Sequence, residues 1–399
     1  MATMASVVDR PRRGGDGVRV AINLLGLSSY VDRLQMLGAL SGHLTELVVL
    51  TDVVPPGFDA TCAKWPRMRV IPLGGKRFVR AAFRWLEASR GALDVVHDTF
   101  GFLAPFFQAY GPRTDRDFRL VNTLYTSNRA WFDRVRKGPI DLDFRYTMQR
   151  VLSLWKDARV CPWSDRVLVL GPGHAADLPA HVDPTRVAWL PSEVDCEAFT
   201  PGPPGGAPRQ DLLFVGNVCR NKGVDVLLES MATLRETWPS LRLELVGMVL
   251  FRETDWLREA TARAGVGDIV TVSGRVPREA LLDRYRSASL FVLPSRFEGS
   301  PRSVREALAC GCRVVASDIP GHRGIDPEGR FLRFLSSFDA ADWVPAIDEQ
   351  LRATPEAAGD RAQAGVQWMR AHHTPAAVAA RLFEVYAQVC AEPIRRGPG

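Results

Sequence analysis

The sequence predicts an α/β protein of two doubly wound domains, each a parallel sheet with helices on both faces. Its length of 399 residues fits about two domains. Short apolar runs alternate with segments of helical spacing along most of the chain, which is typical of parallel sheets. The segment Phe199–Pro208 (FTPGPPGGAP) is rich in proline and glycine and has no periodicity, as expected of a linker. Two such domains imply a cleft between them, with ligands at the carboxyl ends of the strands.

The first half of the chain starts with MATMASVVDRPRRGGDG, which lacks an apolar run and is expected to be a disordered lead-in. Strands and helices then alternate up to the linker. The expected strands are Val18–Leu25, Leu47–Leu50, Met68–Leu73, Leu93–His97, Leu120–Leu124 and Val167–Leu170, and the expected helices are Tyr30–Leu40 and Arg77–Ser89.

The second half repeats this alternation. Its expected strands are Leu212–Val215, Leu241–Val246, Ile269–Val272 and Leu290–Leu293, and its expected helices are Val224–Arg235, Trp256–Ala264 and Arg278–Tyr285. A further helix and strand are expected within Arg296–Ser317. The sequence thus predicts a lead-in over 1–17, a first domain over 18–200, a linker over 201–208, a second domain over 209–373 and a final helical segment over 374–399.

The composition is that of an ordinary globular protein, with 46% hydrophobic and 24% charged residues. No apolar run approaches 18 residues and the start lacks an apolar signal core, so neither a membrane span nor secretion is expected. Seven cysteines, an odd number, fit a reduced cytoplasmic setting better than a disulfide framework. The net charge is +6, but the basic residues are scattered, so nucleic acid is not an expected partner.

The chemistry is concentrated in Arg296–Ser317, RFEGSPRSVREALACGCRVVAS, where seven residues separate Glu298 from Glu306. Ser300 suits a helix N-cap and Pro301 suits the first helical position, so Glu298 would lie in a loop before that helix. Both carboxylates would then face one pocket, beside a helix N-terminus whose free N–H groups suit a phosphate. This arrangement fits a sugar nucleotide. The same spacing also fits a capped surface helix with two solvated glutamates.

The turn after the strand Leu212–Val215 is the second candidate site, because it contains Gly216, Asn217, Arg220 and Lys222. Cations on a strand-to-helix turn beside a helix N-terminus form a phosphate site, although a solvated basic turn has the same composition. The chain has 46 arginines and five lysines, so a lysine at this position is informative. A compact ammonium differs chemically from a guanidinium.

Four segments together resemble the family-4 glycosyltransferases, which are retaining enzymes of the GT-B fold. EGSPRSVREALACGCRVVASDIPG, from Glu298 to Gly321, is similar to their Glu-x7-Glu signature and the run that follows it. FVGNVCRNKGVDVLLES resembles the phosphate turn of their second domain, and LPSEVDCEAFTPG resembles the segment before their linker. Pro375–Val389 resembles the last helix, which crosses back to the first domain. The resemblance implies an acceptor-binding first domain and a nucleotide-sugar-binding second domain.

The resemblance also implies a role for each matching residue. Glu306 would bind the ribose hydroxyls, Glu298 would hold hydroxyls of the transferred sugar, and Lys222 would neutralise the diphosphate. Further donor contacts are implied for Gly299, Ser300 and Pro301 along the sugar and phosphate, for Arg275 and Val276 beside the nucleobase, for Gly216 and Asn217 in the phosphate turn, and for Gly26 after the first strand.

Three positions depart from the family pattern. Asn217 stands where the family usually has an arginine, and Arg220 is the candidate to supply the missing charge. Gly26 is not followed by the second glycine that the family often has. Tyr125 stands where the family often has a histidine near the acceptor, so Tyr125 and His97 are the candidate catalytic residues of the first domain. A structural role explains His97 equally well.

A retaining transfer proceeds by double displacement on a carboxylate nucleophile or by front-face attack. Asp98 is only a weak candidate for that nucleophile, so front-face attack is expected from the resemblance. Lys222 and the helix N-terminus near Pro301 would stabilise the charge of the leaving group. With these groups in place, neither a metal nor a cofactor is expected.

The expected donor is a UDP-sugar, with a GDP-sugar as the alternative, and the expected acceptor is a small soluble molecule of specialised metabolism. A lipid-linked or saccharide acceptor at a membrane is the alternative, because Arg77, Arg80 and Arg84 share one face of an amphipathic helix. A non-catalytic sugar-nucleotide-binding module is an alternative of another class, given the departures at Asn217 and Tyr125. A glycosidase would leave the phosphate turn unexplained.

Overall fold

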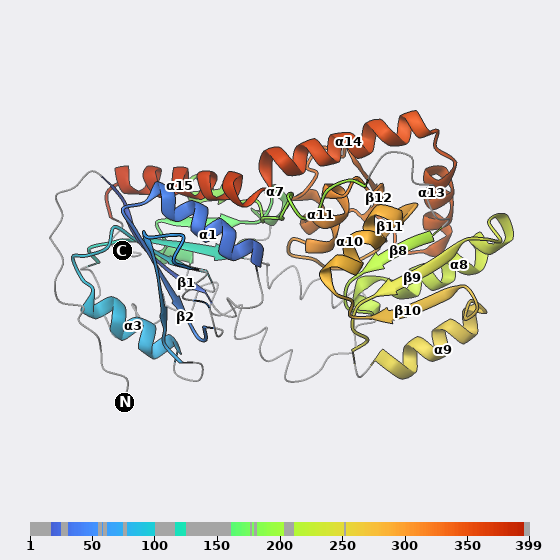
Figure 1. Ribbon diagram of the computed structural model, residues 1–399, viewed down its shortest axis with the longest axis horizontal. Coiled ribbons are helices and arrows are strands. Elements are labelled where there is room, and N and C mark those ends of the chain that lie inside the picture. Colours follow the sequence, from blue (N-terminus) through green and yellow to red (C-terminus); the bar gives the residue numbers. More distant parts are fainter. Residues whose placement is uncertain are drawn as a thin grey trace.

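The computed structural model contains two parallel sheets that lie side by side, each with its own covering helices (Figure 1). The described residues are 17–24, 31–54, 58, 62–74, 78–99, 116–124, 161–175, 178, 182–202, 211–250 and 253–394. The predicted α/β class with two doubly wound sheets is confirmed.

The first sheet has seven strands in the order β3-β2-β1-β4-β5-β6-β7, and every pairing between neighbours is parallel. From β1 the chain adds β2 and β3 on one side, and then β4 to β7 on the other side. The topological switch point, where the strand order reverses, therefore lies between β1 and β4. The strands are β1 (Arg19–Leu24), β2 (Glu46–Thr51), β3 (Met68–Pro72), β4 (Val95–Asp98), β5 (Arg119–Leu124), β6 (Arg166–Val169) and β7 (Val187–Trp189).

The second sheet has six strands in the order β10-β9-β8-β11-β12-β13, again with only parallel pairings. Its switch point lies between β8 and β11, which are hydrogen-bonded neighbours. The strands are β8 (Asp211–Val215), β9 (Arg242–Val246), β10 (Val270–Gly274), β11 (Leu290–Leu293), β12 (Val314–Ser317) and β13 (Leu332–Leu335).

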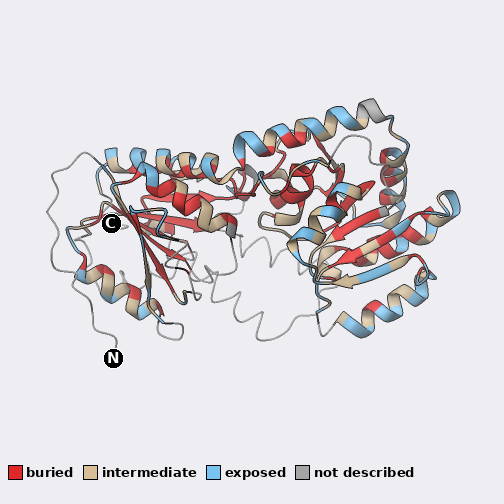
Figure 2. Ribbon diagram, viewed as in Figure 1, coloured by how far each residue is buried: buried red, intermediate tan, exposed pale blue. Residues whose placement is uncertain are grey.

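The central strands are almost wholly buried, which explains why they appear in the sequence as continuous apolar runs (Figure 2). All four residues of β11 and of β12 are buried, and these strands contribute to one core with the helices around them. The helices are α1 (Val31–His43), α3 (Phe78–Ala88), α7 (Pro172–Ala175), α8 (Val224–Thr237), α9 (Thr254–Ala264), α10 (Arg278–Ser287), α11 (Arg302–Ala309), α12 (Pro320–Arg323), α13 (Ala340–Arg352), α14 (Pro355–His372) and α15 (Pro375–Ala391).

The last two long helices, α14 and α15, run over the second and the first sheet respectively (Figure 1). Thr374 caps α15, because its hydroxyl accepts a hydrogen bond from the N–H of Ala377 at 3.2 Å. Leu382, Val385 and other residues of α15 belong to the core of the first sheet, where the helix packs against α1. The exact domain boundaries given above remain predictions.

The amphipathic helix of the first half, expected over Arg77–Ser89, is α3. Phe78, Ala82 and Leu86 are buried in the core beneath the first sheet, whereas Arg80 and Arg84 are exposed. The apolar face of α3 is therefore already occupied by the protein's own core. Among the described residues, no helix is both long and apolar enough to cross a membrane.

Candidate active site

The two predicted motifs follow strands β8 and β11, which are neighbours at the switch point of the second sheet. Because parallel strands end at the same edge of a sheet, the turn Gly216–Gly223 and the loop Pro294–Pro301 lie side by side. The switch point is where doubly wound sheets bind their ligands. The topology thus brings together two motifs that are some 80 residues apart in the sequence.

Gly223 allows the two loops to touch. Its φ of 74° is in the left-handed region, and a Cβ atom there would lie 2.1 Å from the carbonyl oxygen of Pro294. The guanidinium of Arg296 then joins the loops, with hydrogen bonds of 2.8 and 2.7 Å to the two carboxylate oxygens of Asp225 and a further bond to the carbonyl of Arg220. Sequence reasoning did not identify Arg296 or Asp225, although a bidentate pair of this kind fixes the geometry of both loops.

Lys222 and Glu298 form an ion pair at the point where these loops meet. The side chain of Glu298 is 9% exposed and that of Lys222 is 21% exposed, so the pair is largely shielded from water. The hydroxyl of Ser295 donates a second hydrogen bond to the same carboxylate oxygen of Glu298 at 2.8 Å. Glu298 and Lys222, which belong to separate motifs in the sequence, are thus in direct contact, and Ser295 is a further member of the candidate site.

Gly321 packs closely against the backbone of Glu298. A Cβ atom at Gly321 would lie 2.5 Å from the carbonyl oxygen of Glu298, so only glycine permits this approach without a shift. Gly321 is the last residue of the quoted sequence segment that starts at Glu298. Its presence there is explained by this contact.

The helix that carries Glu306 begins one residue later than predicted. Its N-cap is Pro301, with an extended backbone at φ −67° and ψ 120°, and its first helical residue is Arg302. Ser300 is not the N-cap, because its hydroxyl and its carbonyl accept hydrogen bonds from Arg305 at 2.5 and 2.9 Å. No side chain among the described residues caps the first turn, so its N–H groups are available to an anion.

Glu306 is buried in the second turn of α11, at 6% exposure, and accepts a hydrogen bond of 3.0 Å from the hydroxyl of Tyr285. Burial raises the pKa of Glu306, and the positive charge of Arg302 opposes that rise. Burial also raises the pKa of Tyr285 well above its usual value, so its hydroxyl stays protonated and remains a donor. Neither glutamate is a solvated surface residue, so that alternative is wrong.

Arg220 lies on the short helix Arg220–Lys222, but its side chain points to the start of α9. There its Nε atom is 3.3 Å from a carboxylate oxygen of Glu253, and its guanidinium lies 5.5 Å from the ring centroid of Trp256. Asn217, three residues earlier in the same turn, is exposed. The prediction that Arg220 supplies the charge missing at Asn217 remains a prediction.

The loops after β9 and β10 lie at the same edge of the second sheet. Gly247, at φ 141°, packs so closely that a Cβ atom would lie 1.8 Å from the carbonyl oxygen of Gly216. Its N–H donates a 2.8 Å hydrogen bond to the carbonyl of Gly274, directly before Arg275 and Val276. Arg275 is exposed and Val276 is half-buried, and both lie in the loop directly after the outer strand β10, at the same edge of the sheet as the ion pair.

His97 lies at the corresponding edge of the first sheet, on β4, but it is only 2% exposed. Its Nδ1 atom is 2.7 Å from the hydroxyl of Tyr386 and its Nε2 atom is 2.7 Å from the hydroxyl of Thr123. Burial lowers the pKa of His97 to about 3, so the ring is neutral. These contacts are what a structural histidine requires, and an acceptor role for His97 remains a prediction.

Tyr125 and Gly26 lie outside the described residues. The other side chains at the edge of the first sheet form a buried hydrogen-bonded cluster. The amide of Asn23 donates to Asp98 at 2.8 Å and accepts from the N–H of Thr99 at 2.7 Å. Asp98 is buried within this cluster at 0% exposure.

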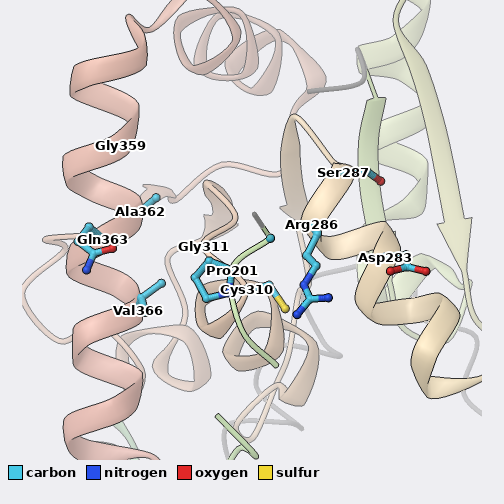
Figure 3. Close-up of a pocket in the computed structure, with 11 residues that line it drawn as sticks. Pro201, Asp283, Arg286, Ser287, Cys310, Gly311, Gly359, Ala362, Gln363 and Val366 are labelled. Atoms are coloured by element: carbon cyan, nitrogen blue, oxygen red, sulfur yellow. The ribbon is translucent and has the colours of Figure 1, made fainter. Parts of the chain in front are cut away.

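A cavity of about 500 Å³ lies elsewhere, at the ends of α10 and α11 that precede strands β11 and β12 (Figure 3). Arg286 of α10 lies on one side of it and Gln363 of α14 on the other, with Pro201 and Gly311 between them. This is the amino edge of the strands, opposite to the edge that carries Lys222. The cavity is therefore not part of the candidate active site.

The family described as glycosyl transferases group 1 matches residues 209–352. A D-inositol 3-phosphate glycosyltransferase from Thermobifida fusca is 31% identical over 310 residues, which cover 67% of this chain and 71% of that protein. One from Streptosporangium roseum is 30% identical, with coverages of 72% and 73%. For a third, from Arthrobacter, the match at 30% identity spans 55% of the relative's length.

Two solved structures share the fold across nearly the whole chain. Sucrose-phosphate synthase from Thermosynechococcus elongatus has a TM-score of 0.71 at 20% identity, covering 94% of this chain and 99% of that one. The Anabaena protein HepE, solved in complex with UDP and glucose, has a TM-score of 0.69 at 14% identity, covering 93% and 99%. The expected GT-B fold is confirmed. Because the sequence relatives also match across most of both chains, this protein belongs to the group 1 glycosyltransferases.

Proposed function

We propose that this protein is a retaining glycosyltransferase that moves a sugar from a nucleoside diphosphate sugar to a small hydroxylated acceptor. The observation that carries the proposal is the contact between Lys222 and Glu298 at the switch point of the second sheet. A cation for a diphosphate and a carboxylate for sugar hydroxyls lie together, next to the uncapped start of α11. The narrower assignment to family 4 is part of this proposal.

The proposed roles are those that the family resemblance implies, and the positions of the groups support them. Lys222 and the first turn of α11 would stabilise the negative charge that grows on the diphosphate as the glycosidic bond breaks. Glu298 would accept hydrogen bonds from hydroxyls of the sugar, and Glu306 would accept them from the ribose. Asp98 is fully buried and hydrogen-bonded to Asn23, which disfavours it as a nucleophile and supports front-face attack.

A UDP-sugar is the donor that we favour, because HepE shares the fold and was also solved with UDP-glucose. For the acceptor, the relatives named D-inositol 3-phosphate glycosyltransferases favour a small polyol or its phosphate. A place in specialised metabolism and a cytoplasmic location remain predictions. A membrane acceptor is disfavoured because the apolar face of α3 is packed in the core.

Metal-independent transfer is also part of the proposal, and it rests on Lys222 and α11 as the source of positive charge. The sequence does contain two Asp-x-Asp spacings, at Asp115–Asp117 and Asp141–Asp143, a residue pattern that can suit a divalent cation. A chelator therefore provides a direct test. Activity that EDTA abolishes and Mg²⁺ restores would contradict this part of the proposal.

The central experiment combines a panel of UDP- and GDP-sugars with polyol and sugar-phosphate acceptors, and measures release of the nucleoside diphosphate. Release that depends on the acceptor is expected for a transferase, whereas release without one would indicate hydrolysis. NMR of the product should show the anomeric configuration of the donor. Glu298→Gln should abolish release, and Glu259→Gln, at an exposed position of α9, serves as its matched control. Nucleotide binding without turnover on any acceptor would instead favour the non-catalytic module.

A further inference from the structure

The start of α1 in the first domain contacts the starts of α10 and α11 in the second domain. Asp32, in the first turn of α1, has no exposed surface. One of its carboxylate oxygens lies 3.3 Å from Nη1 of Arg278, the first residue of α10. The other lies 3.5 Å from Nη1 of Arg302, the first residue of α11. A buried anion of one domain is thus enclosed by two cations of the other.

This burial depends on the contact between the domains. Removing a carboxylate from water is costly unless cations and hydrogen bonds compensate for the loss. The oxygen of Asp32 nearest to Arg302 accepts no hydrogen bond within the described part of the chain, so Arg302 is its main compensation. If the two domains moved apart, Asp32 would return to water and both arginines would lose this partner. The cluster therefore stabilises the arrangement in which the domains touch.

The segment that leads from the first domain to the linker is part of the same cluster. Nη2 of Arg278 is 2.9 Å from a carboxylate oxygen of Asp195, and its guanidinium lies 4.7 Å from the ring centroid of Phe199. Nε of Arg33, next to Asp32, is 2.6 Å from a carboxylate oxygen of Glu193, which is only 4% exposed. The ion pairs thus link α1, the segment 193–199 that precedes the linker, and the helices α10 and α11 of the second domain.

The cluster is also adjacent to the donor site proposed above. Arg302 and Glu306 are four residues apart on α11 and so share one face of that helix. The carboxylate of Glu306 interacts electrostatically with both Arg302 and Asp32. Besides the larger effect of burial, Arg302 lowers the pKa of Glu306 and Asp32 raises it. The position of the first domain is therefore coupled to the helix that would hold the nucleotide sugar.

We propose that Asp32 is a positioning residue of the transfer reaction, which holds Arg302 and Arg278 and so keeps the first domain over the donor site. The inference rests on the proposed function. The nucleotide would be bound mainly by the second domain, through Lys222, Glu306 and the start of α11, so its affinity should depend little on Asp32. Transfer requires the acceptor domain in place, so turnover should depend on Asp32 strongly.

The test is the variant Asp32→Asn, which keeps the shape of the side chain and removes its charge. Turnover should fall about tenfold, which corresponds to about 1.4 kcal/mol, while the dissociation constant for UDP changes less than twofold. Asp342→Asn is the matched control, because Asp342 is an exposed acidic residue in the first turn of α13. Equal turnover in Asp32→Asn and the control, or an equal loss of UDP affinity and turnover, would overturn the inference.

A double-mutant cycle with Arg302→Gln separates a specific contact from general damage. Each single variant should lower turnover, and the double variant should be no slower than the slower single one, because both remove the same contact. Losses that simply multiply would overturn the inference. Asp32→Glu should recover part of the turnover. If Asp32→Asn does not fold, Arg278→Gln and Arg302→Gln alone provide the test, since both side chains are 35% exposed.

Small-angle scattering with UDP present provides a readout that does not depend on turnover. Asp32→Asn should show a larger radius of gyration than the wild type and Asp342→Asn. Wild-type protein that neither binds UDP nor turns over any donor would contradict the proposed function. Wild-type activity together with an unchanged radius and turnover in Asp32→Asn would contradict this inference alone.

Discussion

Replacing Lys222 by methionine tests the ion pair on which the candidate site depends. Methionine keeps most of the aliphatic stem, but among the described residues it leaves Glu298 with the hydroxyl of Ser295 as its one hydrogen-bond donor. Breaking a fully buried ion pair costs about 3 to 5 kcal/mol, and an exposed pair contributes about 0 to 1 kcal/mol. Since the two side chains are 21% and 9% exposed, the expected loss is intermediate, at about 2 kcal/mol.

Thermal unfolding measures this loss as a fall in Tm of about 4 to 8 °C for a domain of this size. Glu298→Gln should cost less, because Lys222 is the more exposed partner and can reach water. The double variant Lys222→Met with Glu298→Gln should be more stable than Lys222→Met alone, because no uncompensated charge remains. Turnover should stay low in all three variants.

Two results would refute this reasoning. A wild-type Tm in Lys222→Met would mean that the contact contributes nothing to stability. Recovery of turnover in the double variant would mean that Lys222 only balances the charge of Glu298 and does not act on the donor. Glu259→Gln again provides the control for the loss of one acidic side chain.

The remaining predictions concern four positions. Lys222→Arg should lower turnover about tenfold in steady-state kinetics, because a planar guanidinium needs more room than an ammonium. Glu306→Gln should weaken UDP binding in calorimetry without unfolding the protein. Gly223→Ala should lower Tm sharply, because its Cβ would meet the carbonyl of Pro294. Burial lowers the pKa of His97 to about 3, so the unfolded state binds a proton that the folded state does not, and stability should fall between pH 6.5 and 3. His97→Gln should make that dependence in pH-dependent unfolding shallower.

The parts that sequence could predict are those in which each residue follows a local rule. Continuous apolar runs predicted most of the buried strands, and the spacing of Glu298 and Glu306 together with the turn at Lys222 indicated both halves of the candidate site. The N-cap was predicted wrongly at Ser300, because a local preference was outweighed by hydrogen bonds from Arg305.

Contacts between distant segments could not be predicted in the same way. Tyr285 reaches Glu306 from another helix, and Asp32 meets Arg302 from another domain. Nothing in the neighbouring sequence of Tyr285 or Asp32 distinguishes them from ordinary helix residues. Their roles depend on the order of strands and on the approach of the two domains, which only the three-dimensional structure supplies.

The ion pair has a consequence for how a donor would enter the site. Lys222 has Glu298 as its partner, so a diphosphate would replace one anion with another beside the same cation. This exchange avoids the cost of burying a bare charge. It would also release the carboxylate of Glu298 where sugar hydroxyls need an acceptor. If Lys222 and Glu298 could not separate, the protein would bind nucleotide sugars weakly. The strength of this contact is therefore expected to determine donor affinity as well as turnover.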